Sequence, residues 1–501
     1  MAMLVLLSHL KYKIIIFCAL LFVFSSAFAQ KQEKQVASVD SMLVNYFNRS
    51  FDSLFLGRIN TIDTSLLNFS HFEALNKGYN VFSTLSSNGL AYKSMIFTPN
   101  FYNGFDTRQH SFSRYIQTSE DTRFLKPLIP FSELNYMMGS KKEQHLGVTF
   151  TRQIANRLFI GMEFMIDDAP GPYKYSQSKN SRVYFTTRYN VKNNRYGITS
   201  NYFNNKVLVQ ENGGIVNDAD FENNLETDRR LIEVNLQDAN NKIKQSGAGL
   251  EQYFILSPPT KILPDSVEVE AKSKFRLGRI THQLEYLRNQ LIYSEKSPLA
   301  DFYQPFDIVL DSLKTYDSVY QMTFKNRFQW SNLGYKMHAN DIPLYIYGGV
   351  ELVNASTSDS TYKQDIWQVN PYGGVQISLF RSFYIDGNVK LITGNHSNGD
   401  LVFNGGVKQF LGTESRNLGN IFFQFKLMNQ SPSWIFERYY SNHFRWENEF
   451  TSSKYVSFLA GYYFKGVTFG ANIHFIDKHI YLNTDARPNQ SSGTTKMLHL
   501  Y

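Results

Sequence analysis

Cysteine is almost absent from this 501-residue chain, and the single one, Cys18, lies in an apolar N-terminal segment. If that segment is removed, disulfide bonds, thiolate nucleophiles and cysteine-ligated metals are excluded. Long apolar runs are also lacking after residue 30, because no stretch approaches the roughly 20 residues of a membrane-spanning helix. The net charge of +8 comes without a basic cluster. This distribution argues against a nucleic-acid surface and indicates only a mild preference for anionic surroundings such as phosphate-bearing lipid.

The N-terminus has the pattern of a secretory signal peptide. Lys11 and Lys13 precede an apolar run from Ile14 to about Phe24, and the small-x-small sequence that ends at Ala29 follows. We therefore predict cleavage between Ala29 and Gln30, with residues 1–29 removed. An uncleaved membrane anchor is the alternative, but the apolar run is too short for it.

Aromatic residues are abundant, with 42 Phe and 32 Tyr, and they recur at every second position. In "PLIPFSELNYMMGSKKEQHLGVTF", Leu134, Tyr136 and Met138 alternate with polar residues, and the alternation resumes after "GSKKEQ". A period of two residues is typical of a strand with one apolar face. In segments such as "YQMTFKNRFQW", charged residues stand between aromatic ones, which a strand buried on both faces would not tolerate.

About 16 segments of this kind follow residue 126, each close to the 9–11 residues of a membrane-spanning strand. Their apolar faces are too extensive for one sandwich core. The fold class that we predict for residues 126–501 is all-β, a transmembrane antiparallel β-barrel of about 16 strands (14–18) with long extracellular loops. Its apolar face would meet lipid and its polar face a lumen. Residues 30–125 alternate weakly and leave open an extra strand pair, a periplasmic extension or a hatch in the barrel.

The connections between the predicted strands differ in length, which bears on orientation. Long polar connections are expected from Asn204 to Gln245 and from about Asn289 to Asp317, and outer-membrane barrels place such loops outside. The short turn from Gly139 to Glu143 is expected on the periplasmic side if its neighbours keep the alternation. The segment "HFRWENEFT", residues 443–451, is predicted to be a wall strand.

Four segments carry a resemblance to a known family. They are "DTSLLNFSHFEAL" from Asp63, "PFSELNYMMGSKKEQHLGVTFTRQI" from Pro130, "ENGGI" from Glu211 and "VNLQDANNK" from Val234. Together they resemble the β-barrel porin family of gram-negative outer membranes, over most of the chain after the leader. The resemblance implies an outer-membrane location and a passive diffusion channel, and it carries over no catalytic residue.

Charged side chains on the polar face of the predicted strands are the candidate lumen residues. The basic ones are Arg182, Arg188, Arg279, Lys325, Arg327, Lys390, Lys426 and Arg445, and the acidic ones are Glu163, Glu285, Asp386, Glu447 and Glu449. Facing rows of opposite charge would order water and filter solutes by charge. Paired charges that stiffen the wall explain the same residues equally well.

Two further patterns are weaker. The run "DADFENN", Asp218 to Asn224, alternates oxygen-bearing side chains but lacks the glycine and distal glutamate of a calcium loop, so a solvated acidic loop is favoured. His474 and Asn472 share a strand face near several serines, which would allow a lipid hydrolase only if a serine lay within hydrogen-bond reach at the barrel rim. No metal, cofactor or catalytic residue is assigned.

The function that we predict is an outer-membrane porin for small hydrophilic solutes, without enzymatic activity. The alternatives are a transporter of hydrophobic substrates, in which the N-terminal region is a hatch, an outer-membrane enzyme that acts on lipid, and a closed structural or adhesive barrel. The expected partners are outer-membrane lipid and lipopolysaccharide, the barrel-assembly machinery and small solutes, with no nucleic acid, and homo-oligomerisation stays open.

Overall fold

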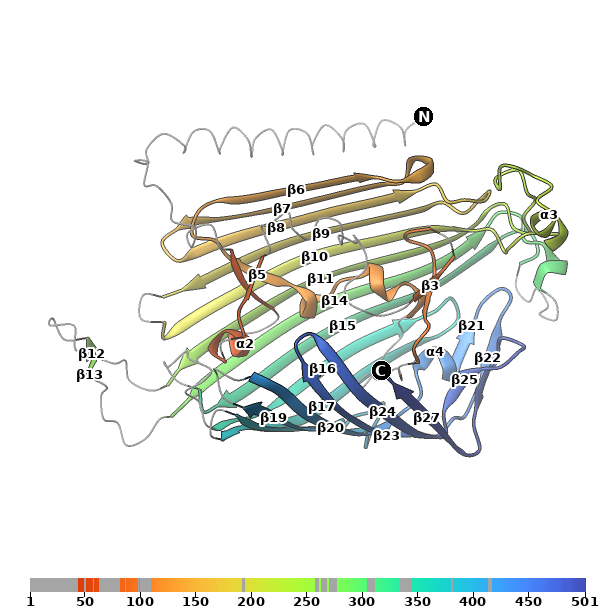
Figure 1. Cartoon of the computed structure of the whole chain (residues 1–501). Coiled ribbons are helices and arrows are strands. Elements are labelled where there is room, and N and C mark those ends of the chain that lie inside the picture. The colour runs from red at the N-terminus through yellow and green to blue at the C-terminus, as the bar shows by residue number, and fades with distance from the viewer. Residues whose placement is uncertain are drawn as a thin grey trace, which may run out of the picture. The chain divides into compact units, whose positions relative to one another are not determined.

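A computed structural model represents the chain (Figure 1). The structure describes residues 44–48, 51–56, 58–62, 82–85, 87–97, 99, 110–191, 194–256, 261–262, 268–269, 277–303, 311–333, 344–379, 382–412 and 417–501. The predicted leader, with its cleavage site at Ala29 and Gln30, lies outside the described residues. Among the described residues, no helix is both long and apolar enough to cross a membrane.

Sixteen antiparallel strands form one sheet, in which each strand pairs with the next strand of the sheet along the chain (Figure 1). They are β6 (Phe131–Met138), β7 (Gln144–Ala155), β8 (Leu158–Ala169), β9 (Ser178–Asn190), β10 (Tyr196–Glu211), β11 (Ala239–Ile255), β14 (Arg279–Glu295), β15 (Thr315–Ser331), β16 (Leu344–Ser358), β17 (Lys363–Leu379), β18 (Phe383–Leu391), β19 (Leu401–Gly412), β20 (Asn417–Gln430), β23 (Ser453–Phe464), β24 (Val467–Asp477) and β27 (Thr494–Leu500). The predicted all-β class and strand number are confirmed.

The strand register separates the side chains into two faces. Leu134 lies opposite Val148, while Glu133 lies opposite Thr149 and Thr149 opposite Glu163, so apolar and polar residues form separate rows. The apolar row is open to the surroundings, and Leu134 keeps 70% of its surface exposed. An exposed apolar face on sixteen strands is the pattern of a lipid-facing wall. We call this the outer face and the opposite one the inner face.

The connections alternate between two ends of the sheet. At one end lie residues 212–238, 296–303, 311–314, 431–452 and 478–493, which we call the long-loop end. At the other end the connections are shorter, apart from the one between β11 and β14. Gly139 to Glu143 joins β6 to β7 at this same end, so the expected grouping with the short periplasmic turns is wrong, because an antiparallel order brings every second turn to the same end. The long connections are also shorter than predicted, since β10 extends to Glu211 and β14 to Glu295.

The segment 443–451 is not a wall strand. Its residues Arg445–Glu447 form β22, which pairs only with β21 (Arg438–Tyr440), within the connection between β20 and β23. Alternation of apolar and polar residues is a signal of any strand with one covered face. The pattern alone therefore does not distinguish a hairpin within a connection from a strand of the wall. The connection also holds α4 (Trp434–Glu437).

Short elements from the N-terminal part of the chain pack on the inner face. They are β1 (Asn45–Asn48), α2 (Phe51–Phe55), β2 (Asn60–Thr61), β3 (Phe82–Thr84), β4 (Tyr92–Ser94), η3 (His110–Tyr115), η4 (Ser119–Asp121) and β5 (Arg123–Lys126), of which β2, β1 and β5 form a three-stranded sheet. We call the described residues between 44 and 126 the plug. Of the alternatives left open for this region, its placement corresponds to the hatch.

Two apolar clusters join the plug to the inner face. Phe47, Phe51 and Phe124 pack with Tyr253 and with other inner-face residues, all below 9% exposure. A second cluster, nearer the long-loop end, joins plug residues Leu90, Phe112 and Tyr115 to wall residues Val207, Val209 and Ile243. The sequence predicts a polar inner face, whereas in these two places the inner face is apolar because it covers the plug.

The smaller elements that remain lie in connections. They are η5 (Ser140–Lys142), α3 (Asp218–Glu222), β12 (Lys261–Ile262), β13 (Glu268–Val269), η6 (Ala300–Tyr303), β25 (Ile480–Leu482) and β26 (Pro488–Gln490). The terminal strand β27 keeps Leu498 and Leu500 on the outer face, with 61% and 68% exposure, and His499 opposite Asn472 on the inner face.

The first and last strands of the sheet, β6 and β27, are not paired with each other among the described residues. Sixteen is an even number, so these two strands run antiparallel and have the orientation that closure of a barrel requires. In hydrocarbon, the free edge of each strand would leave backbone groups without hydrogen-bond partners, at several kcal/mol per group.

We therefore expect the edge amides of β6 and β27 to be protected in a lipid bilayer. Hydrogen exchange read by mass spectrometry should show protection of Phe131–Met138 close to that of β10, while the β22 amides, outside the sheet, exchange faster. Fast exchange confined to β6 and β27 in the bilayer would contradict closure.

Candidate functional site

Helix α2 anchors the plug through one carboxylate. Asp52 forms an ion pair with Arg279 of β14, and it accepts hydrogen bonds from Gln329 Nε2 at 2.8 Å and Tyr345 OH at 2.9 Å. The backbone N–H of Phe51 donates to Glu251 Oε1 at 2.9 Å. The side chain of Arg279 has no exposed surface. A buried cation of this kind needs its partner. The ion pair and the two hydrogen bonds to Asp52 together tie α2 to β14, β15 and β16.

A second ion pair holds β5 on the opposite part of the wall. Arg123 donates to both carboxylate oxygens of Glu163, with Nε–Oε1 at 3.2 Å and Nη2–Oε2 at 2.5 Å. Burial lowers the pKa of Arg123, but the charge of Glu163 outweighs this and leaves the pKa above its ordinary value. A two-point contact of this geometry fixes orientation as well as position.

Polar contacts extend along the plug between these two anchors. Asn201 Nδ2 donates to Thr122 Oγ1 at 2.9 Å, and Asn205 Nδ2 donates to the carbonyl oxygen of Gln117 at 2.6 Å. Nearer the long-loop end, Ser87 donates to Glu143 at 2.7 Å. These wall residues lie on β10 and in the first connection, so the plug contacts the wall along most of its height.

The predicted lumen residues that belong to wall strands share the inner face. These are Glu163, Arg182, Arg188, Arg279, Glu285, Lys325, Arg327, Asp386, Lys390 and Lys426, as the cross-strand register shows. Several of them are covered rather than open to water. Arg182 is 6% exposed and Arg188 8%, and the guanidinium of Arg188 lies 5.0 Å from the Phe47 ring centroid of the plug.

Arg445, Glu447 and Glu449 are not on the wall, which corrects their assignment to the lumen. Glu447 contacts its own hairpin, at 3.3 Å from Arg438 and 2.7 Å from Tyr440 OH. Glu449 follows β22 in the same connection. The reason is the hairpin described above, which pairs outside the sheet.

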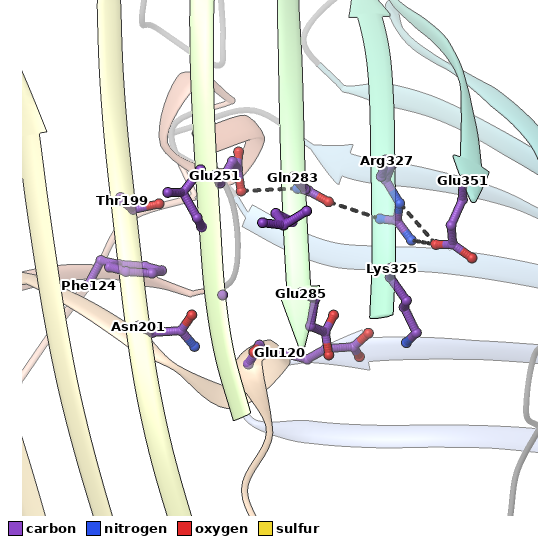
Figure 2. A pocket seen from close by; sticks show the side chains of 14 residues that line it. Glu120, Phe124, Thr199, Asn201, Glu251, Gln283, Glu285, Lys325, Arg327 and Glu351 are labelled. Carbon is purple, nitrogen blue, oxygen red and sulfur yellow. Dashed lines mark hydrogen bonds and ion pairs between the residues drawn. The ribbon is translucent and has the colours of Figure 1, made fainter. Parts of the chain in front are cut away.

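A cavity of about 70 Å³ lies between η4 and the wall (Figure 2). Glu120 and Phe124 line it on the plug side, and the wall side carries Glu251, Glu285 and Lys325 among others. Figure 2 shows a chain of hydrogen bonds along one border, from Glu251 through Gln283 and Arg327 to Glu351. Its charged lining suits water and small polar solutes.

Glu351 is the centre of the largest charge network on the wall. It is 3% exposed, pairs with Arg327, accepts from Lys390 Nζ at 2.6 Å and lies 3.4 Å from Asn370 Nδ2. One buried carboxylate thus neutralises two of the predicted lumen cations. For Arg327 and Lys390, the interpretation as paired charges that stiffen the wall describes the contacts observed.

A different part of the inner face remains open. Asp386 on β18, Lys408 on β19 and Gln424 on β20 are exposed side chains on this face, and Lys390 and Lys426 are half-buried beside them. The covered arginines and these open residues lie on different strands. The contacts of the plug lie mainly on β7 to β17, where Arg58 donates to Gln376 at 3.0 Å, with a further ring contact between Phe97 and His474 of β24. The lumen is therefore asymmetric, with accessible polar groups on β18 to β20.

The connection 431–452 reaches across to the connection between β14 and β15. His443 Nε2 lies 3.0 Å from Glu295 Oε2 and 3.0 Å from Thr315 Oγ1, and its ring stacks on Tyr303 at 3.5 Å. Asn442 N donates to Asp317 Oδ1 at 2.8 Å. Burial, and then the hydrogen bond to Glu295, raise the pKa of Tyr303 above its ordinary value. We call the contacts of His443 and Asn442 with these residues of β14, β15 and their connection the outer latch.

The weaker sequence patterns have structural explanations. Asp218–Glu222 is helix α3, with the Asn217 side chain accepting from Ala219 N at 3.1 Å. Within the described part of the chain, no three His, Cys, Asp or Glu residues are placed to hold a metal ion. Ser457 Oγ lies 2.7 Å from His474 Nδ1, but the pair is buried on the inner face and does not meet lipid at the rim.

Sequence reasoning missed Asp52 and Glu251, which anchor the plug, and Glu351, the centre of the charge network on the wall. Glu351 stands on the polar face of a strand that the alternation does predict, so its position was available in the pattern. Asp52 lies in a stretch with the amphipathic pattern of a short helix, where α2 occurs, but its partners are more than 200 residues away. No local pattern connects residues at that separation.

The family described as "Putative porin" matches residues 50–501, which is more than half of the chain. This chain belongs to that family. It is an outer-membrane β-barrel, and the family match extends over both the plug and the wall. No curated protein matches the chain.

Several solved structures are similar to the chain at low identity. A ferric enterobactin receptor mutant from Pseudomonas aeruginosa matches with 8% identity and a TM-score of 0.46, over 70% of this chain and 53% of its own. The ferric-catecholate import receptor Fiu of Escherichia coli K12 matches with 11% identity and 0.46, over 72% and 60%. The copper transporter OprC matches with 9% identity and 0.48, over 76% and 60%. This family member thus spans about half to three fifths of their lengths.

Replacing Asp52 should loosen the plug. In Asp52→Ala, Arg279 stays buried without its partner, a change that costs about 3 kcal/mol and raises the open population of α2 roughly 100-fold. Limited trypsin cleavage after Arg58, measured on the folded protein, should accelerate accordingly.

The matched control is Asp218→Ala, which removes an exposed first-turn acid from the five-residue helix α3. It should leave cleavage after Arg58 unchanged. Equal cleavage rates in the wild type and Asp52→Ala would show that the ion pair does not hold the plug.

Proposed function

We propose that the protein is a diffusion channel for small hydrophilic solutes whose plug restricts the flow. The observation that carries this proposal is the asymmetric lumen. The plug is fixed to one part of the wall through Asp52 and Arg279, while Asp386, Lys408 and Gln424 remain accessible on the other. Family membership supports a channel, and the accessible polar groups favour hydrophilic over apolar cargo.

A role without catalysis is part of this proposal. Its support is the family membership, together with the chemistry of the inner face, where the principal charged groups are paired with one another. We also propose that outer-membrane lipid, lipopolysaccharide and the barrel-assembly machinery are partners, as expected for an outer-membrane barrel, and that a signal peptide directs export. Homo-oligomerisation stays open.

The outer latch supports a restricted channel rather than a wide one. It joins the connection between β20 and β23 to the one between β14 and β15, at the long-loop end. By the rule that long loops face outward, this is the external mouth. A solute that enters from outside would pass the latch first and then the open strands β18 to β20.

Planar-bilayer recording of the purified full chain tests the proposal. We expect discrete but small conductance steps for the wild type, because the plug occupies part of the cross-section. Asp52→Ala should give larger or longer openings, and Asp218→Ala should match the wild type.

Absence of steps in all three proteins at every voltage would contradict a channel and favour the closed structural or adhesive barrel. Steps of unchanged size and duration in Asp52→Ala, despite faster cleavage after Arg58, would contradict a restricting role for the plug while leaving the channel intact.

Ion selectivity should depend on the open residues. Asp386→Lys replaces a negative charge by a positive one in the accessible part of the lumen, a net change of two charges, so the reversal potential in a salt gradient should shift toward anion preference. Asp218→Lys makes the same change on α3, in the connection between β10 and β11 and apart from the latch residues, and should shift the reversal potential little. An unchanged reversal potential in Asp386→Lys would place the conducting path elsewhere.

A further inference from the structure

The outer face of β10, β11 and β14 changes character toward the long-loop end. One cross-strand row is apolar, with Tyr202, Ala248, Tyr286 and Phe324 side by side. The next two rows are polar and basic, namely Asn204, Ser246 and Arg288, then Lys206, Lys244 and Gln290. In the row after these, Lys242 stands between Leu208 and Ile292. All of these residues point to the same side as the lipid-facing aromatic residues.

Three lysines in these rows are neighbours of like charge. Lys206 lies directly opposite Lys244, and Lys242 is two residues from Lys244 on the same face. Like charges placed directly opposite each other destabilise a sheet. No described carboxylate lies within ion-pair distance of any of the three. We call Lys206, Lys242 and Lys244 the lysine patch.

Two other outer-face lysines near the long-loop end have acidic neighbours. Lys179 on β9 lies 3.2 Å from Asp168, and Lys454 on β23 lies opposite Asp477. The lysine patch differs from these two lysines in lacking a carboxylate and in placing like charges next to one another. Arg288 lies one row below it, with its guanidinium 5.2 Å from the Tyr320 ring centroid.

The height of the patch follows from the strand geometry. An aromatic and apolar row at the opposite end of the same strands contains Tyr196, Phe254, Ile280 and Trp330, as in the interfacial girdle of a barrel. Lys206 is ten residues from Tyr196 along β10. At about 3.3 Å per residue and a tilt of about 45°, the separation along the membrane normal is about 23 Å.

That height is close to the roughly 25 Å apolar band of outer-membrane barrels. The lysine patch thus stands where the hydrocarbon of the outer leaflet ends and its headgroups begin. At this depth, an outward-pointing ammonium group meets lipid headgroups, and the anion available there is phosphate. Phosphate oxygens form short charge-assisted hydrogen bonds with ammonium groups and remove the repulsion between them.

We propose that the lysine patch binds the phosphate group of a lipid in the outer leaflet. Lys206 and Lys244 lie on paired strands and hold the phosphate between them, and Lys242 adds a third positive charge on the side of the headgroup. The proposal needs the barrel to stand in the membrane with its long-loop end outward. It does not depend on whether the lumen conducts.

Lipid binding by the full chain in detergent tests the proposal, with lipopolysaccharide and enzymatically dephosphorylated lipopolysaccharide as the two probes. The test variant is Lys206→Gln with Lys244→Gln, and the control is Lys179→Gln with Lys454→Gln. At about 1 kcal/mol per lysine, the test pair should bind the phosphorylated probe about 30-fold more weakly, and the control should stay within about twofold of the wild type.

Replacement by arginine at positions 206 and 244 should keep binding, and both double variants should migrate as folded barrels on unheated gels. Equal binding of the two probes by the wild type would overturn the proposal, as would equal losses in test and control variants. Strong competition by millimolar inorganic phosphate would indicate a free-phosphate site and would also overturn it. Bilayer conductance of the test pair should match the wild type, which separates this proposal from the channel itself.

Discussion

A strand that crosses a membrane has to place every backbone hydrogen bond within the protein, and the rest of this structure depends on that constraint. Sixteen strands meet it by pairing in chain order. Pairing sets the two-residue period, and the period places aromatic residues on one face and polar residues on the other. The two faces then have different tasks, because one is solvated by lipid and the other has to accommodate water and the plug.

The inner face meets its task in two ways. Against the plug it is a protein core, with apolar clusters around Phe51 and Leu90 and ion pairs at Asp52 and Arg123. On β18 to β20, Asp386, Lys408 and Gln424 stay accessible, although Val402 and Met428 are buried in an apolar cluster nearer the long-loop end. The same face is therefore a packed interior on one side and a channel wall on the other. A function that combines retention and passage is consistent with this division.

The sequence predicts the features that repeat from strand to strand. The period identifies the strands, the outer face of Leu134 and Met138, and the inner face of Arg182 and Lys390, since register carries these assignments from strand to strand. It cannot predict which inner charges are covered, because coverage depends on Asp52 and Phe47, whose partners are remote in the sequence. The β21–β22 hairpin shows a different error. Its alternating pattern does form a strand, but that strand lies in a connection and not in the wall.

The separation between the plug and its partners also bears on assembly. Asp52 contacts Gln329 and Tyr345, which follow it by 277 and 293 residues. Contacts at such separation form late, because a long loop has to close first. Asp52 is therefore held only once β14, β15 and β16 are all in place. A wall that lacks any of these strands would hold the plug less firmly, so retention of the plug reports on completion of the wall.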